Sequence, residues 1–293
     1  MRVSEISEVV DFRTTLHSSP LALIENSAVS SRRQPTGHER GYQVVLPYSG
    51  LFAYNVGRRR WLIDPNRVLC ISPGWEFFDE HPVEGIGHAA LLLSPAAEIV
   101  HEICGFPGPS LNSAFNLATI PSTSRLRMLT HLMLRWPAEL DNPLLRDEWA
   151  VHALQELSEP RRTQSRASRL IDRAKEALHA HGCERLSLNE IARLVGISPV
   201  YLTQEFTRSE GIPLYQYQLR LRMNRALLEL PQCENITGLA LDLGFSSHSH
   251  FTSVFHKSFG LTPSQYRSGS QPIRLGESSS RGVLRGIKSR RAA

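Results

Sequence analysis

The feature that most constrains this chain is a pattern that occurs twice near its carboxyl end. Apolar residues follow one face of a helix from 188 to 195, and the same spacing recurs 48 residues later, from 236 to 243. Beyond the first helix of each copy, matching residues of the two copies are 49 positions apart. The matching positions are then Leu202 and Phe251, Phe206 and Phe255, Gly211 and Gly260, and Tyr217 and Tyr266. Two copies in register predict a duplicated structural unit.

Each copy has the residues expected of a helix, a tight turn and a second helix. Ser187 and Asn235 stand where a helix is capped, and Ser187 with Glu190 predicts a capping box. Gly196 and Gly244 follow an alanine by four residues, and glycine permits the backbone conformation of a sharp turn. The repeat therefore predicts two helix-turn-helix motifs, each with its second helix buried on one face only.

A further helix is predicted between the copies, from Pro213 to about residue 230. Its buried stripe should contain Leu214, Tyr217, Leu221 and Leu228, with Arg220, Arg222 and Arg225 mostly elsewhere. Eighteen helical residues span about 27 Å. A spacer of that order suits two helices that enter successive major grooves, which lie about 34 Å apart.

These segments resemble the AraC/XylS family of transcriptional regulators. The resemblance rests on IARLVGISPVYLTQEFTRSEGIPLYQYQLRLRMNRALLEL and on LALDLGFSSHSHFTSVFHKSFGLTPSQYR, and it covers about 100 residues, roughly 166–268. It implies a two-headed DNA-binding domain and a one-component regulator, whose partners are double-stranded DNA and, for an activator, RNA polymerase. Activation and repression are both compatible with the sequence, which also leaves the target genes open.

The amino-terminal half has the pattern of a β-rich unit. Short apolar runs at 42–46, 51–56, 61–63, 68–71 and 86–93 alternate with Gly, Pro, Asn and Asp, as in a sandwich or barrel. Helices are predicted near 95–103, 124–140 and 144–157, with Pro137 ending or kinking the second. The stretch 37–82 resembles the cupin-like effector-binding domains often joined to such a module. That resemblance implies a sensor barrel whose adjoining helices dimerise.

The predicted fold is therefore a multidomain α+β protein. It has a cupin-like β-barrel with dimerisation helices at 1–157, a polar linker at 158–168, an all-α double helix-turn-helix domain at 169–267 and a disordered basic tail at 268–293. Charge divides at the linker: residues 1–160 hold 13 basic and 18 acidic residues, whereas 161–293 hold 20 and 10. The basic half is suited to a polyanion. The tail supplies six of those basic residues against one acidic residue, so it is a candidate electrostatic arm.

Candidate DNA contacts lie on the second helix of each motif. The positions turned away from the buried residues, which are the candidate base readers, are Val200, Thr203, Gln204, Thr207, His248, Ser249, Thr252 and Ser253. The resemblance implies that Val200, Thr203 and Gln204 occupy base-facing sites. Gln204 has the amide that pairs bidentately with adenine. The candidate phosphate contacts are Arg208, Arg222, Arg225 and Lys257. A solvated surface is the alternative for each, and Arg222 and Arg225 are alternatively structural ion-pair partners.

An effector pocket, if the sensor has one, is predicted around aromatic and polar residues of the barrel. The candidates are Trp61, Trp75, Phe77, Phe78 and His81. The sequence does not indicate what the effector is, or whether there is one.

The alternative function is a metal-dependent cupin enzyme with an accessory helical domain. Its ligands would come from His38, Glu39, Glu76, Glu80, His81 and His88, but the barrel region lacks the family's H-x-H pair. No P-loop or nucleophile elbow is present either. We therefore predict no enzymatic activity, no metal and no cofactor.

Compartment and assembly follow from simpler features. The four separated cysteines (Cys70, Cys104, Cys183 and Cys233) predict reduced thiols, with Cys70 in the core. No apolar run approaches the ~18 residues of a membrane span. A cytoplasmic homodimer without membrane contact is the expectation, although the oligomeric state rests only on the helices at 124–157.

Overall fold

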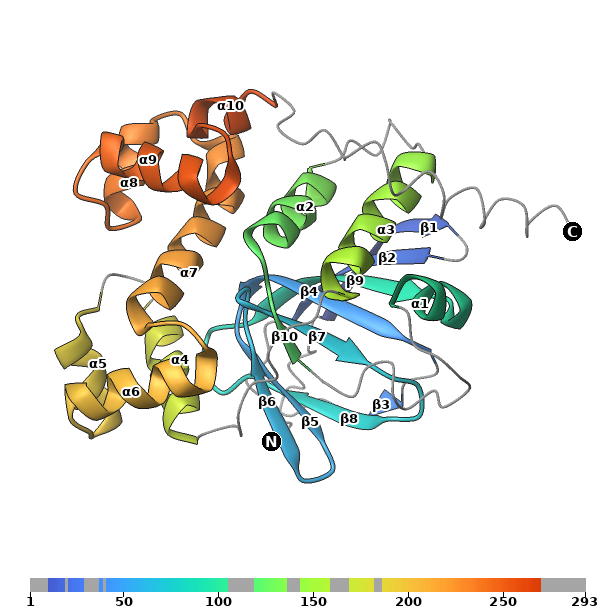
Figure 1. Cartoon of the computed structure of the whole chain (residues 1–293), viewed down its shortest axis with the longest axis horizontal. Helices are drawn as coiled ribbons and strands as arrows, with labels where there is room; N and C mark the ends of the chain where they lie inside the picture. The colour runs from blue at the N-terminus through green and yellow to red at the C-terminus, as the bar shows by residue number, and fades with distance from the viewer. Residues whose placement is uncertain are drawn as a thin grey trace, which may run out of the picture.

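The computed structural model describes residues 10–18, 21–28, 37–38, 41–104, 119–135, 143–158, 169–181 and 186–269. Figure 1 shows a sheet-rich amino-terminal half beside a helical carboxyl-terminal half. Residues 159–168 and 270–293, and with them nearly all of the predicted linker and tail, lie outside the described residues, as does Pro137. None of the described helices has the length and apolar content to cross a membrane.

The strands form two antiparallel sheets. The six-stranded sheet has the order β1 (Val10–Ser18), β2 (Leu21–Ala28), β9 (His88–Pro95), β4 (Gln43–Gly50), β7 (Arg67–Ile71) and β10 (Thr119–Pro121). The four-stranded sheet has the order β3 (Gly37–His38), β8 (Glu76–Glu80), β5 (Phe52–Val56) and β6 (Arg59–Ile63). The described strands form no closed barrel, so the β-rich half is confirmed in this coarser form.

Alternation along the strands of the six-stranded sheet places apolar side chains on both of its faces. Val44 and Leu46 of β4 belong to a core shared with the covering helices, whereas Val45 between them packs with β5 and β6. Cys70 is fully buried in the helix-side core, as predicted. The half is thus layered as helices, six-stranded sheet and four-stranded sheet.

Three helices cover the outer face of the six-stranded sheet (Figure 1). They are α1 (Ala97–Cys104), α2 (Ser124–Leu134) and α3 (Pro143–Ser158), close to the predicted ranges. Trp149 and Leu154 of α3 pack in the sheet core, and Trp149 also donates from Nε1 to the carbonyl of Leu129 in α2 at 2.7 Å. The apolar faces of α2 and α3 therefore pack within the chain.

The carboxyl-terminal half contains two small cores joined by one helix. The first core takes its residues from α4 (Arg169–Ala180), α5 (Leu188–Val195), α6 (Pro199–Glu210) and the start of α7 (Leu214–Glu229). The second takes them from the end of α7, the 3-10 turn η2 (Leu230–Gln232), α8 (Ile236–Asp242), α9 (His248–Phe259) and α10 (Pro263–Arg267). Met128 of α2 also lies in this second core. Helix α7 therefore connects the two helix-turn-helix units, as the sequence predicts.

Candidate nucleic-acid interface

The first helix-turn-helix unit has the predicted caps and turn. Ser187 Oγ accepts from the amide of Glu190 at 3.3 Å, and the Glu190 carboxylate accepts from the Ser187 amide at 2.7 Å. These two bonds make the capping box at the start of α5. Gly196 ends α5 with φ +79°, a conformation that favours glycine. Leu202 and Phe206 are fully buried, so α6 is held by one face and exposes the other.

The second unit repeats this construction. Asn235 Oδ1 accepts from the amides of Thr237 and Gly238 at 3.0 and 3.1 Å, and Gly244 makes the turn with φ +75°. Ser247 caps α9, and its hydroxyl accepts from the amide of His250 at 3.1 Å. The aromatic pair on the inner face of α9 is fully buried, as its counterpart on α6 is.

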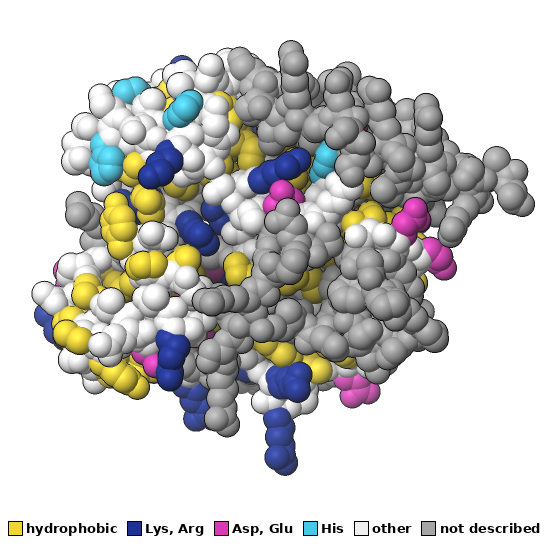
Figure 2. Space-filling model, viewed as in Figure 1, with side chains coloured by type: hydrophobic (Ala, Val, Ile, Leu, Met, Phe, Trp, Pro, Cys, Tyr) yellow, Lys and Arg dark blue, Asp and Glu magenta, His cyan; other side chains and the backbone are white. Residues whose placement is uncertain are grey.

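All four candidate base readers of α6 are exposed, and Val200 is the most open of the large apolar residues, at 68%. The hydroxyls of Thr203 and Thr207 donate to carbonyls one turn back in their own helix, at 2.9 Å each. Their hydroxyl protons are thus already used, which leaves the oxygens as acceptors, whereas the side-chain amide of Gln204 makes no such bond within its own helix. Figure 2 shows apolar side chains exposed over α5 and α6. This face can make both apolar and hydrogen-bonding contacts.

On α9, Ser249 and Ser253 are exposed, and His248 and Thr252 are half-buried. His248 lies near two hydroxyls, with Nδ1 3.5 Å from Thr237 Oγ1 and Nε2 3.3 Å from Thr252 Oγ1. Figure 2 shows histidine side chains gathered over the α8–α9 unit. The face of α9 that carries these candidates is therefore polar and rich in imidazole, whereas the corresponding face of α6 also exposes the apolar Val200.

The four candidate phosphate contacts divide into exposed and buried side chains. Arg208 and Lys257 are exposed, and Arg208 pairs with Glu205 at 2.6 Å in its own helix. Arg225 pairs with Glu229 one turn along α7 at 2.5 Å, which is the structural alternative that the sequence left open.

Arg222 is placed differently from its expectation as a phosphate contact. It is 4% exposed, its guanidinium lies 5.0 Å from the ring centroid of Phe245, and Nη1 donates to the carbonyl of Gly244 at 3.2 Å. The side chain therefore fixes the turn of the second unit and is not presented to a phosphate. Leu228, expected in the buried stripe of α7, is only half-buried, whereas Leu227 is buried.

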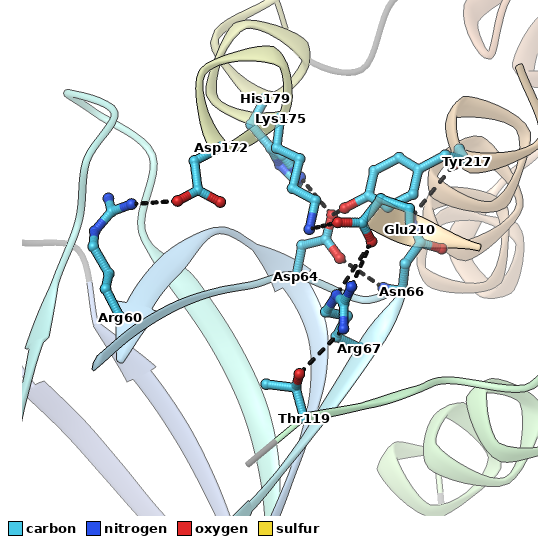
Figure 3. A network of polar contacts seen from close by, with 10 residues as sticks. All are labelled: Arg60, Asp64, Asn66, Arg67, Thr119, Asp172, Lys175, His179, Glu210 and Tyr217. Atoms are coloured by element: carbon cyan, nitrogen blue, oxygen red, sulfur yellow. Dashed lines mark hydrogen bonds and ion pairs between the residues drawn. The ribbon is translucent and has the colours of Figure 1, made fainter. Parts of the chain in front are cut away.

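A buried polar network between the two halves was not predicted from the sequence. Figure 3 shows Arg67 and Lys175 converging on Glu210, and His179 and Tyr217 converging on Asp64. A usable signal existed in α6, because Glu210 continues the stripe formed by the buried residues four and eight positions before it. A charged residue in line with a core stripe indicates a buried partner.

Charges within the network shift two pKa values. Burial alone would raise the pKa of Asp64, but the hydrogen bond and charge of His179, with Lys175 and Tyr217, bring it below its usual value. Burial raises the pKa of Tyr217 well above its usual value, and the charges of Asp64 and Glu210 add to the effect. The carboxylate is thus held ionised and the phenol protonated.

The candidate pocket residues do not form one cluster. The indoles of Trp61 and Trp75 lie parallel with centroids 6.3 Å apart, and Phe77 stacks on Tyr54 at 4.9 Å, all beside the core between the sheets. The carbonyl of Phe78 accepts from Asn55 Nδ2 at 3.2 Å.

His81 pairs with a second histidine: its Nε2 lies 2.8 Å from Nδ1 of His88, whose ring stacks at 4.1 Å on Phe52 of the same core. Burial and the neighbouring His81 lower the pKa of His88 to about 3. Within the described ranges, no group of three or more His, Cys, Asp or Glu side chains is arranged to hold a metal ion. Glu39 falls outside those ranges, and of the His38 side chain nothing is described.

Comparison with known proteins gives matches to the helical half. A family model described as a helix-turn-helix domain matches residues 191–269. Over 96 residues the chain is 40% identical to an uncharacterized HTH-type transcriptional regulator of Staphylococcus aureus, covering 32% of this chain and 12% of that protein. Over 113 residues it is 30% identical to the Msm operon regulatory protein of Streptococcus mutans, covering 38% and 40%.

Among solved structures, a transcriptional regulator with an AraC-type DNA-binding domain from Chromobacterium violaceum aligns at 34% identity with a TM-score of 0.33. It covers 36% of this chain and 96% of that one. The chain spans less than half of the length of the two curated relatives.

Proposed function

With residues 191–269 belonging to the AraC-type helix-turn-helix domains, we propose that the chain is a sequence-specific DNA-binding transcriptional regulator. The observation that carries the proposal is the pair of units with exposed reading helices, α6 and α9, joined by α7. The 16 residues of α7 span about 24 Å. This length suits two units that read successive major grooves on one side of a duplex.

The proposed base contacts divide between the two helices. Val200, Thr203, Gln204 and Thr207 read one half-site, and His248, Ser249, Thr252 and Ser253 read the other. Arg208 and Lys257 contact phosphates, since both are exposed beside these faces. Arg225 reaches a phosphate only by giving up its pairing with Glu229.

For the amino-terminal half we propose a cupin-like sensor at 1–157, connected through a linker at 158–168 to the DNA-binding domain at 169–267. The aromatic residues between the two sheets, Trp61, Trp75 and Phe77, are the first candidates for effector contacts. The basic tail at 268–293 serves as an electrostatic arm, and the protein acts as a homodimer. The roles of sensor and DNA-binding domain together make regulation, rather than catalysis, the function that this architecture serves.

The test is selection of DNA from a random duplex library by the full-length protein, followed by titration of the enriched site at two salt concentrations. We expect two short motifs whose centres lie about 10 base pairs apart, because the helices read successive grooves. Affinity should fall steeply with salt, since phosphate contacts release counterions. Failure to enrich any sequence, or binding that is insensitive to salt, would contradict the proposal.

A double variant distinguishes DNA binding through α6 and α9 from non-specific electrostatic binding. Gln204→Glu combined with Ser253→Glu places one carboxylate on each exposed reading face without touching a buried residue. Repulsion from the phosphates should abolish binding to the enriched site. Circular dichroism should match that of the wild type, and retained binding would show that these two helices do not face DNA.

A further inference from the structure

Glu210, the last residue of α6, is the meeting point of the two halves. Its Oε1 pairs with Lys175 Nζ of α4 at 2.5 Å, and its Oε2 accepts from Arg67 of β7, from Nη2 at 2.9 Å and from Nε at 3.2 Å. All three side chains are less than a tenth exposed. Charges removed from water are stable only in close, well-bonded arrangements, so this contact has one preferred geometry. The end of α6 is thereby tied to a strand of the other half.

A second link joins the β6–β7 turn to the start of α7. Asp64, which is 1% exposed, accepts a hydrogen bond from the hydroxyl of Tyr217 and lies 3.2 Å from His179 Nε2. Asn66 Nδ2 donates to the carbonyl of Tyr217 at 3.4 Å. Figure 3 shows these contacts beside those of Glu210, between the sheets and the helices of the first unit. The turn thus holds both α4 and α7.

The second unit is held by the same half through α2. Arg135, which caps the end of α2, donates from Nη1 to the carbonyl of Tyr266 at 2.8 Å, and its guanidinium lies 4.8 Å from the centroid of that ring. Met128 of α2 is 1% exposed within the core that contains Phe251 and Phe255. Each helix-turn-helix unit therefore has its own attachment to the amino-terminal half.

These attachments leave the reading faces open. The candidate base readers of α6 are exposed and those of α9 are exposed or half-buried, whereas Arg67, Asp64 and Glu210 are buried. The amino-terminal half thus contacts each unit through buried residues and leaves the candidate base readers of α6 and α9 uncovered. Attached in this way, the amino-terminal half can determine how α6 and α9 are placed relative to each other.

We propose that the contacts Arg67–Glu210, Asp64–Tyr217 and Arg135–Tyr266 form a clamp that sets the distance and angle between α6 and α9. The clamp thereby makes the two helices fit DNA sites whose half-sites lie at one particular spacing. This inference rests on the proposed DNA-binding function and deepens it by assigning spacing selectivity to the amino-terminal half. Two binding units fixed in the correct geometry act together, whereas units that move independently lose part of that advantage.

The test compares Arg67→Met with Arg59→Met in the full-length protein. Arg67→Met removes one of these links, the ion pair with Glu210, and leaves Glu210 paired with Lys175 and the contacts of Asp64 and Arg135 in place. Arg59→Met removes the same charge from the exposed start of β6 and serves as the control. The probes are the site enriched by the wild type, each of its half-sites alone, and versions with one or two base pairs inserted between the half-sites.

For Arg67→Met we expect affinity for the complete site to fall about tenfold, as effective concentration is lost, while half-site affinity stays unchanged. The inserted base pairs should cost this variant less than they cost the wild type. Arg59→Met should behave as the wild type. Equal or tighter binding of the complete site by Arg67→Met would overturn the clamp, and so would an equal loss on complete and half sites.

A second variant covers the case in which Arg67→Met does not fold. Arg60→Met breaks the partly exposed pairs with Asp172 at 3.0 Å and Glu176 at 3.3 Å, and it should show a smaller change of the same sign. Without DNA, amide hydrogen exchange in α4 and α6 should be faster in either variant than in Arg59→Met. Unchanged exchange and unchanged spacing preference would refute the clamp. A wild type that enriches no DNA would instead refute the proposed function.

Discussion

Asn224, in the middle of α7, donates from Nδ2 to the carbonyl oxygen of Tyr48 in β4 at 2.6 Å. The pairing of β4 with β9 shifts register between Pro47 and Ser49, so Tyr48 lies at an irregularity of the ladder. The Oδ1 of Asn224 accepts from His131 Nε2 of α2 at 3.0 Å. One side chain thus joins the connecting helix to both a strand and a helix of the amino-terminal half.

Replacing this asparagine should destabilise the whole chain. In Asn224→Ala the Tyr48 carbonyl and His131 lose their hydrogen bonds to Asn224, and removing one partner of a buried hydrogen bond costs about 1–3 kcal/mol. Urea unfolding should show a loss of that order. Asn189→Ala, on the exposed side of α5, is the matched control and should stay within about 0.5 kcal/mol of the wild type. Equal effects of the two variants would contradict a role for the Asn224 contact.

Stability should also depend on pH through His131. Burial, assisted by the charge of Arg127 and opposed by the bond to Asn224, lowers its pKa to about 4. The unfolded chain has the ordinary value near 6.5 and binds the proton more readily, so folding stability falls as the pH drops from 6.5 towards 4. This shift is worth on the order of 3 kcal/mol.

The measurement is the free energy of unfolding at several pH values between 7 and 4 in the wild type and in His131→Gln. The variant should lose less stability on acidification than the wild type does. Some slope should remain, because the pKa of His88 is lowered to about 3 and acts with the same sign. His256→Gln, at an exposed position, should keep the profile of the wild type. A His131→Gln profile parallel to that of the wild type would rule out this source.

Two glycines of the amino-terminal half should respond differently to substitution by alanine. Gly50 has φ +74°, and a Cβ there would lie 1.8 Å from the carbonyl oxygen of Gly87, which accepts from the amide of Leu51. Gly74 has φ +87° with open space around the position. Gly74→Ala should cost about 1–2 kcal/mol for the left-handed backbone, and Gly50→Ala should cost clearly more. Thermal unfolding distinguishes them, and similar melting temperatures would mean that the loop at Gly87 moves away freely.

Base reading and phosphate contact should separate in two single variants. Gln204→Ala should change the preferred base at one position of one half-site, with about 1–3 kcal/mol of discrimination lost there. Arg208→Ala should weaken all sequences alike and reduce the dependence on salt by about one phosphate contact. Repeating the selection and the salt titration with each variant tests this assignment. Indistinguishable behaviour of the two would mean that Gln204 does not read a base.

The sequence predicted those parts of the structure whose causes are local. Caps at Ser187 and Asn235, glycines in the turns and helical periodicity gave both helix-turn-helix units and α7 nearly to the residue. Strand β8, with the sequence EFFDE, was missed because its residues do not alternate between apolar and polar. The first hairpin, β1 with β2, was missed as well, since its runs mix charged and apolar residues.

The contacts between the halves could not be predicted because their partners are far apart in the chain. Asp64 and Tyr217 are separated by 153 positions, and nothing near either residue indicates the other. Arg222 was interpreted as a surface arginine for a similar reason. Its burial depends on Phe245, which reaches it only after α8 has folded back. Local sequence patterns determine where helices form. Whether a charged side chain is exposed or buried depends on contacts with residues far away in the chain, which a short stretch of sequence does not contain.

The buried Glu210 restricts the exchange of halves between related proteins. A helical half transplanted onto a foreign sensor would keep Lys175 beside Glu210 but lose Arg67, and Asn224 would lose the carbonyl of Tyr48. The graft would then hold unmatched polar groups at its junction, each of which costs free energy. A working chimaera of this protein must therefore bring the β6–β7 turn and the irregular end of β4 along with its DNA-binding helices.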